Sequence, residues 1–298
     1  MYSIFESELQ KIDKKMEDGI SMDIPSLFKK IPLEIFSELS LGVPGDYPNI
    51  KKWFPLMPSE EVQIHWTGNH GKVLLDQTTK FVKTLISGFS EITNKKLTGS
   101  KVLDFGCGWG RIIRLLYKYT SEENIYAVDP WDESIRMCKE KNLKGNFSMI
   151  DYLPMSLPFN EKFDLIFAFS VFTHLSEKAA VIAMDTLRKY ITDDGVMVIT
   201  IRPKEYWNVL DKNKNRHGRL AKELLQLHDQ YGFAFRSSDY ASGGGTPLDS
   251  APVDGVITYG DASMTFKYIE NNFMGWEIIS VEWDSVDPLQ IIVFLKPV

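Results

Sequence analysis

From about residue 100 onward, short apolar runs alternate with segments whose apolar residues recur at helical spacing. The runs are KVLDFG, NIYAVDP, NFSMID, FDLIFAFS and VMVITIR, and each has the length of a buried strand. Between them lie RIIRLLYKY, ESIRMCKE and residues 176–190, which have helical spacing. Such alternation is typical of βαβ units, in which helices cover both faces of a mostly parallel sheet. We therefore predict an α/β fold, with residues 192–195 (TDDG) as the turn into the VMVITIR strand.

The remaining segments surround this pattern. Residues 1–60 are repeatedly interrupted by proline, and residues 72–88 have helical spacing, so we expect residues 1–90 to form a helical arm or lid beside a domain of residues 91–298. Residues 203–260 are expected to be an insertion on the substrate side, with a helix around 219–231 and a loop over 241–255. A helix near 262–273 and the strands GWEIISVEW and LQIIVFLKP are expected to complete the sheet.

The strongest local signal is the sequence VLDFGCGWG at residues 102–110, where a strand runs into a glycine-rich turn. Ligands of open α/β sheets bind beyond the carboxyl ends of the strands. Gly106, Gly108 and Gly110 let the backbone approach a ligand closely and adopt positive φ. Asp129 ends the next strand, where a carboxylate can accept hydrogen bonds from both hydroxyls of a ribose.

The spacing of the turn distinguishes between two adenine-containing ligands. The dinucleotide fingerprint G-x-G-x-x-G requires glycine where this chain has Arg111. Asp104 instead precedes Gly106 by two residues, and a pyrophosphate is poorly served by an adjacent carboxylate. A sulfonium ligand with a free ammonium group is well served, so the residues favour S-adenosylmethionine over NAD.

The segments LDFGCGWGR, YAVDP, MIDYLPMSLPF, FDLIFAFSVFTHL and DDGVMVITI resemble, in order, the motifs of class I S-adenosylmethionine-dependent methyltransferases. The resemblance covers residues 100–202 and, more loosely, 262–298. It implies a Rossmann-like seven-stranded sheet of order 3-2-1-4-5-7-6 with strand 7 antiparallel. SVFTHL and the final QIIVFLKP also resemble a branch encoded with glycan and cell-surface polysaccharide pathways.

The resemblance also implies donor-binding roles for residues along these motifs. They are Asp104, Gly106, Cys107, Gly108 and Gly110 around the methionine part, Asp129 at the ribose, Pro130 or Trp131 against the adenine, Asp151 and Tyr152 at the adenine amino group, and Ser170 near the methyl group. Trp109 is bulky for such a turn. Cys107 is not expected to be a nucleophile, because small residues commonly fill this turn and buried thiols are inert.

His174 is the candidate catalytic residue, because it follows the fourth strand, where the family places residues that face the acceptor. A histidine near neutral pKa can take a proton from a hydroxyl, although a helix cap or a core histidine is an equally ordinary role. Further candidates lie in the insertion: His217, His228, Asp229 and Tyr259. Residues 66–70, WTGNH, either close over the donor or form a plain helix-entry loop.

Composition and charge narrow the classes of function that the chain can have. The net charge of −6 does not favour nucleic-acid binding. The two cysteines, Cys107 and Cys138, predict reduced thiols and a cytoplasmic protein, and their spacing predicts no metal site. We find no signal pattern and expect no membrane span.

The predicted reaction transfers a methyl group to an acceptor oxygen or nitrogen, without a need for magnesium. A sugar or glycan hydroxyl is the leading acceptor. The alternatives are another small metabolite, a protein that binds the donor without turnover, or an NAD-dependent oxidoreductase, which Arg111 disfavours. The sequence leaves the oligomeric state open, with a homo-oligomer among the options.

Overall fold

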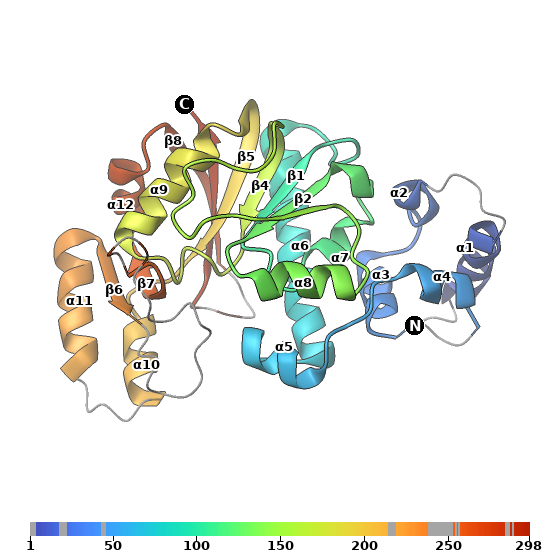
Figure 1. Ribbon diagram of the computed structural model, residues 1–298, viewed down its shortest axis with the longest axis horizontal. Coiled ribbons are helices and arrows are strands. Elements are labelled where there is room, and N and C mark those ends of the chain that lie inside the picture. Colours follow the sequence, from blue (N-terminus) through green and yellow to red (C-terminus); the bar gives the residue numbers. More distant parts are fainter. Residues whose placement is uncertain are drawn as a thin grey trace. The chain divides into compact units, whose positions relative to one another are not determined.

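The computed structural model describes residues 4–17, 23–42, 46–213, 219–237, 253, 255, 257–283, 287 and 289–298. The chain forms two compact units, Met1–Met149 and Ile150–Val298, and each is described by itself (Figure 1). The boundary expected near residue 90 stays a prediction.

The first unit contains three parallel strands with β2 in the middle. They are β1 (Val102–Phe105), β2 (Ile125–Asp129) and β3 (Asn146–Met149), and they are joined through α7 (Ile113–Leu116), the 3-10 helix η2 (Glu122–Asn124) and α8 (Asp132–Glu140). The predicted helix over RIIRLLYKY is much shorter in the structure. Within it the buried Arg114 guanidinium donates to the carbonyls of Pro55 (2.9 Å) and Leu56 (2.8 Å), so long-range contacts fix this segment.

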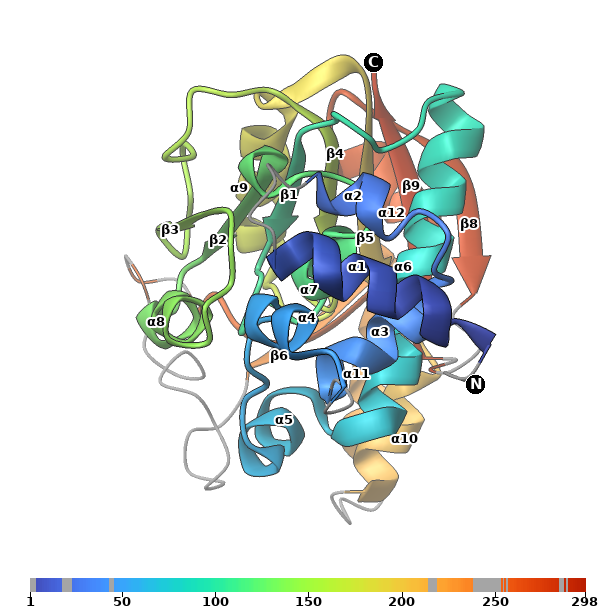
Figure 2. The same ribbon diagram turned by 90° about the vertical axis from the view of Figure 1, so that its right-hand side faces the viewer.

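Six helices precede these strands in the same unit. They are α1 (Glu6–Glu17), α2 (Ile24–Leu27), α3 (Leu33–Leu41), α4 (Pro48–Trp53), α5 (Glu60–Thr67) and α6 (Gly71–Thr93). The predicted helix at 72–88 is confirmed, and α6 is longer. Helices α1 to α4 gather at one side of the unit (Figures 1 and 2), and α3 packs on α6 and α7. The rings of Phe28, Phe36 and Phe54 form the apolar centre of this group.

In the second unit, four of the described strands pair with one another: β4 (Phe163–Ala168), β5 (Ile191–Ile201), β8 (Trp276–Trp283) and β9 (Ile291–Pro297). β4 and β5 are parallel, whereas β9 pairs antiparallel with both β5 and β8. Helix α9 (Glu177–Arg188) connects β4 to β5. The predicted turn at 192–195 is wrong, because these residues continue β5, whose pairing with β4 shifts register between Phe163 and Leu165.

The seven strands follow the order β3-β2-β1-β4-β5-β9-β8. With β8 and β9 as the sixth and seventh strands of the sheet, this is the predicted order 3-2-1-4-5-7-6, and its seventh strand is antiparallel. The prediction of an α/β, Rossmann-like fold is confirmed.

An insertion follows β5, as predicted. It contains α10 (Tyr206–Asn213), α11 (Arg219–Tyr231), β6 (Phe233–Ser237) and β7 (Gly260–Met264), and the two strands form a small antiparallel sheet. The predicted helix near 262–273 is partly wrong: its first residues pair with β6, and α12 (Phe266–Asn272) begins only after Thr265, whose Oγ1 accepts from the amide of Tyr268. His217 and most of the stretch 241–255 lie outside the described residues.

Membrane-spanning helices and metal-binding clusters are both absent from the described residues. No helix among them is long and apolar enough to cross a bilayer. They also contain no group of three or more His, Cys, Asp or Glu side chains placed to hold a metal ion.

Candidate functional site

The glycine turn after β1 is held by backbone geometry. The amides of Gly106 and Cys107 both donate to the carbonyl of Val128 in β2, at 2.8 and 3.1 Å. Gly106, Gly108 and Gly110 have φ of +83°, +54° and +75°. These left-handed values are costly for any residue with a Cβ, so the conformation of the turn requires its glycines.

Gly110 is also required by packing. A Cβ at this position would lie 2.0 Å from Cδ2 of the buried Leu143. A Cβ at Gly108 would meet the Trp66 ring at an ordinary 3.7 Å. Trp109 points into the interior, exposing only 2% of its surface, so its bulk does not obstruct the turn.

Two buried carboxylates flank the turn. Asp129 Oδ2 accepts from the amide of Gly108, and its Oδ1 accepts from the amide of Trp131, both at 2.9 Å. Burial raises the pKa of Asp129, although these hydrogen bonds counteract the rise. Burial and then the charge of Asp129 raise the pKa of Asp104 well above its usual range, while the charge of Arg111 lowers it. A cationic ligand group at this turn would therefore relieve the repulsion between Asp104 and Asp129.

The thiols of Cys107 and Cys138 are free and buried near the same turn. Cys138 Sγ lies 3.3 Å from the carbonyl oxygen of Gly108, to which it donates. A hydrogen bond with Cys138 and burial raise the pKa of Cys107 well above its usual range. Such a thiol is a poor nucleophile, in agreement with the expectation from the sequence.

Trp131, at the start of α8, stacks on Trp66 from α5, with ring centroids 4.3 Å apart and an interplanar angle of 24°. Trp66 also packs against an apolar cluster of Leu74, Trp109 and Met137. One residue of the polar-aromatic segment 66–70 thus lies at the glycine turn.

The second unit contains the other predicted site residues. Asp151 and Tyr152 follow β3 in a loop, with Asp151 exposed and Tyr152 half-buried. Ser170, just after β4, has φ of +58° and donates its amide to Thr200 Oγ1 at 2.7 Å. A serine held in the left-handed region is strained, and such residues concentrate at functional sites.

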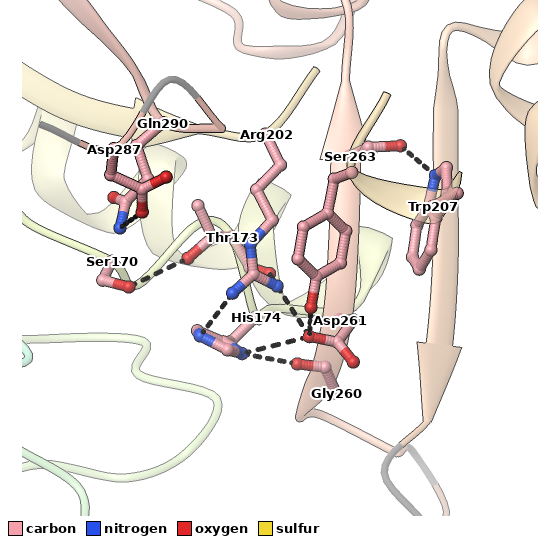
Figure 3. A network of polar contacts seen from close by, with 11 residues as sticks. Ser170, Thr173, His174, Arg202, Trp207, Gly260, Asp261, Ser263, Asp287 and Gln290 are labelled. Atoms are coloured by element: carbon pink, nitrogen blue, oxygen red, sulfur yellow. Dashed lines mark hydrogen bonds and ion pairs between the residues drawn. The ribbon is translucent and has the colours of Figure 1, made fainter. Parts of the chain in front are cut away.

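His174 lies at the centre of a polar network (Figure 3). Its Nδ1 is 2.7 Å from the carbonyl oxygen of Gly260, and its Nε2 is 3.3 Å from Nη2 of Arg202. Its ring stacks on Tyr259 with centroids 5.0 Å apart and an interplanar angle of 7°. A carbonyl can only accept, so Nδ1 carries the proton and the Nε2 lone pair faces the guanidinium.

Asp261 and Arg202 complete this network. Asp261 Oδ1 accepts from Arg202 Nη1 and from the phenol of Tyr206, both at 2.6 Å. Arg202 Nη1 also donates to the carbonyl of Thr173 at 3.1 Å. Burial alone would raise the pKa of Asp261, but the nearby charges of Arg202 and His174 and the hydrogen bonds lower it below its usual range. Asp261 is therefore ionised at neutral pH.

The same surroundings act on His174 in the opposite sense. Burial and the positive Arg202 lower the pKa of His174 to about 4, although Asp261 and the Gly260 carbonyl counteract them. His174 is consequently neutral over the physiological range.

Comparison with known proteins gives these two sets of residues a context. Residues 102–195 match the family model described as a methyltransferase domain. An uncharacterized methyltransferase of Staphylococcus carnosus is 25% identical over 142 residues, which are 47% of this chain and 65% of that protein.

Two solved structures show related folds. An S-adenosylmethionine-dependent methyltransferase of Clostridium acetobutylicum is 15% identical over 72% of this chain and 91% of its own, with a TM-score of 0.45. The magnesium protoporphyrin IX methyltransferase of Synechocystis, crystallised with SAH, is 15% identical over 79% of this chain and 92% of its own, with a TM-score of 0.48.

Within residues 102–195, the prediction of a methyltransferase domain is confirmed. The chain spans 65% of the length of the relative it matches. The activity of the whole protein, its acceptor and its partners are therefore proposals.

The methyltransferase domain brings its predicted donor residues together in part. Asp104, the glycine turn, Asp129 and Trp131 form one group in the first unit. Ser170 and His174 lie near each other in the second, through Thr173, whose Oγ1 is 3.4 Å from Ser170 Oγ. Among the described residues, Asp151 belongs to neither group and is exposed in the loop after β3.

Arg202, Tyr206 and Asp261 were not predicted from the sequence. Arg202 could have been noticed, because it is a cation directly at the end of the VMVITIR strand. Asp261 offered no signal, because β7 reaches the network only through tertiary pairing, in which the amides of Gly260 and Ala262 donate to the carbonyls of His174 and Thr173.

Two further candidates of the insertion, His228 and Asp229, line a cavity of about 600 Å³ in the second unit. Aromatic, amide and charged side chains line it, among them Lys204, Asp229, Gln230, Tyr231, Phe266 and Asn271. Asp229 accepts from Lys204 at 2.9 Å. His228 Nδ1 is 2.8 Å from Ser263 Oγ, which also accepts from Nε1 of Trp207 at 2.7 Å.

Proposed function

We propose that this chain transfers the methyl group of S-adenosylmethionine to a hydroxyl of a sugar or glycan. The observation that carries the proposal is the turn of three left-handed glycines between two buried carboxylates, Asp104 and Asp129. A cationic donor compensates the negative charge of these buried carboxylates, which water does not solvate. A pyrophosphate would add further negative charge beside them.

The donor roles follow from this turn. Asp104 offsets the ammonium group of the methionine part, and the glycines allow that part to lie against the backbone. Asp129 holds the ribose and Trp131 packs on the adenine, while Cys107 and Pro130 shape the pocket walls. We further propose that Asp151 and Tyr152 meet the adenine edge and that Ser170 lines the methyl group.

The reaction is an in-line displacement. A lone pair of the acceptor oxygen forms the new C–O bond, the S–CH₃ bond breaks, its electron pair stays on sulfur, and the hydroxyl proton leaves. Products are the methylated acceptor and S-adenosylhomocysteine. Because the sulfonium is already activated, orientation of the two reactants can supply much of the rate.

His174 is the acceptor-side residue in this proposal. A pKa near 4 and a lone pair directed at Arg202 make it a weak base, so we assign it a positioning role. It holds the Arg202–Asp261 pair and the Tyr259 ring in place, and the acceptor hydroxyl is oriented by this network. The ionised Asp261 is the nearby group that can stabilise the departing proton.

Two features support a sugar acceptor. The SVFTHL segment resembles the glycan-associated branch of the family, and the insertion offers aromatic faces together with amide and carboxylate groups, which suit sugar C–H faces and hydroxyls. Methylation of another small metabolite is the alternative. The two free thiols support a reducing compartment, and we place the protein in the cytoplasm.

The test begins with ligand binding. In a thermal-shift and calorimetric comparison, S-adenosylmethionine and S-adenosylhomocysteine should stabilise the protein, by about 2.7 kcal/mol at a hundredfold excess over Kd, whereas NADH should not. An acceptor screen then measures release of S-adenosylhomocysteine with sugars, nucleotide sugars and other hydroxyl metabolites. Donor binding without turnover on any acceptor would favour a binding protein, and NADH binding alone would contradict the assignment.

A further inference from the structure

We infer that Trp66 controls entry of the donor: its indole lies in the place that the adenosyl group takes, so donor binding requires α5 to move. The site in question is the donor seat, defined by Gly108 and the ring face of Trp131. The inference depends on the proposed donor function of the glycine turn, and it gives one residue of the segment 66–70 a specific role there.

The geometry of the donor seat leaves no room for a further layer. Trp66 lies over Trp131 at 4.3 Å between ring centroids, and its ring is 3.7 Å from the Cβ position of Gly108. The two stacked indoles are in van der Waals contact, whereas a flat ligand between them would need about 3.5–4.0 Å on each of its two faces. An adenine stacked on this face of Trp131 must therefore displace Trp66.

The ribose-binding carboxylate is enclosed by the same residues. Asp129 exposes 7% of its surface, and its two oxygens accept from the amides of Gly108 and Trp131. The ring of Trp66 lies over both of these residues. Movement of Trp66 thus uncovers the face of Trp131 and the turn that Asp129 supports in one step.

Helix α5 has few buried side chains and is followed by glycines, and both features favour its movement. Gln63 is its one residue that is fully buried, whereas Ile64 is 47% exposed. Gly68 and Gly71, which follow the helix, have φ of +77° and +56° and open space around their Cβ positions. A short helix with few buried side chains and glycine joints opens at low cost.

The side chain of Gln63 ties this helix to the segments on both of its sides. Gln63 Nε2 donates to the carbonyl of Pro58 at 2.8 Å, and its Oε1 accepts from the amide of Gly71 at 3.0 Å. Trp66 is itself half-buried, whereas Leu74 and Trp109 beside it expose 1% and 2%. Trp66 is therefore a cover on the core cluster and not one of its enclosed members.

The test compares S-adenosylhomocysteine binding to the full chain and to Trp66→Ala. Loss of the competing ring should lower Kd about two- to tenfold, because that factor corresponds to the stacking free energy of an aromatic pair. In stopped-flow tryptophan fluorescence, the observed rate of the parent protein should level off at high ligand because opening limits it, whereas Trp66→Ala should keep a linear dependence. His65→Ala, an exposed change on the same helix, should behave as the parent.

Gln63→Ala provides an independent variant, because it loosens the tie without touching the seat and should also tighten binding. It decides the question if Trp66→Ala does not fold by circular dichroism. Weaker or unchanged binding in the variants would show that Trp66 is a wall of the pocket or a packing residue and would overturn the inference. If the parent protein binds neither S-adenosylmethionine nor S-adenosylhomocysteine, the donor assignment itself fails with it.

Discussion

The glycine turn of the first unit and the His174 network of the second are built in different ways. The turn is made of consecutive residues and uses mainly backbone: three left-handed glycines and two amides that bond Val128. The network is made of side chains far apart in the sequence, His174, Arg202 and Asp261, which are joined by tertiary pairing.

This difference determines where each site is vulnerable. A backbone site tolerates many side-chain changes but not the addition of a Cβ, because its conformation excludes one. A side-chain network tolerates local backbone variation but depends on every charged member, because each compensates the burial of another. Four experiments, from the largest expected effect to the smallest, test the contrast.

Gly110→Ala should have the largest effect. The new Cβ meets Leu143 at 2.0 Å and holds a φ of +75°. Left-handed strain of about 1–2 kcal/mol and overpacking of about 1–3 kcal/mol should together lower the free energy of unfolding by about 2–5 kcal/mol. Urea denaturation measures it.

Gly99→Ala is the matched control, since Gly99 has φ of +77° but nothing within 4 Å of its Cβ position. It should show the left-handed strain alone. Equal losses in the two variants would mean that packing at Gly110 does not matter.

His174→Ala should affect turnover next. Loss of the imidazole frees the Arg202 and Tyr259 side chains, and misplacement of the acceptor by such a change costs about a hundredfold in kcat. The Kd of S-adenosylhomocysteine, which reports on the glycine turn, should stay unchanged. A parallel loss of donor affinity in calorimetry would contradict the separation of the two sites.

Asp129→Ala should weaken donor binding by about 1–3 kcal/mol, the usual range for removing a hydrogen-bond partner. The variant tests the contrast from the donor side, because maximal turnover at saturating donor should change far less than Kd does. Asp132→Ala, a carboxylate removed from the first turn of α8 where it is exposed, serves as the control. If both variants bind the donor equally, Asp129 does not hold the ribose.

The last experiment varies pH, and the sign of its effect on stability should differ between the two regions. His174 has a folded pKa near 4, below its unfolded value of about 6.5, so its contribution to stability is present above pH 6.5 and is lost as pH falls toward 4. Asp104 has a folded pKa raised above its unfolded value of about 3.9, so its contribution is present at low pH and is lost as pH rises.

Unfolding free energies measured from pH 4 to 8 resolve the two contributions when His174→Gln and Asp104→Asn are compared with the parent. The first variant should flatten the acidic decline, and the second should reduce the loss on raising pH. Parallel curves for all three proteins would show that neither group titrates as its surroundings require.

The same contrast explains what the sequence could predict. Residues 102–110 encode strand, turn and glycines contiguously, so both the fold class and the conformation of the glycine turn could be predicted. Residues 262–264 were assigned to a helix because their pairing with β6 joins segments far apart in the chain. Asp261 was missed for the same reason, since it lies 59 residues from Arg202.

Trp66 was recognised as unusual from its neighbours, but its position over Gly108 and Trp131 could not be predicted. That position depends on how α5 folds back on the unit, and α5 has only one fully buried residue to indicate a packed face. Gly68 indicates where α5 ends, but not in which direction the helix packs.

The burial of both thiols has a practical consequence. Cys107 and Cys138 are the two cysteines of the sequence, and both lie against the glycine turn. A small thiol reagent can modify them only while that part of the chain is transiently open, so the labelling rate under native conditions measures how often the turn opens. Because the sequence has no other cysteine, the labelling rate reports on opening of the glycine turn alone.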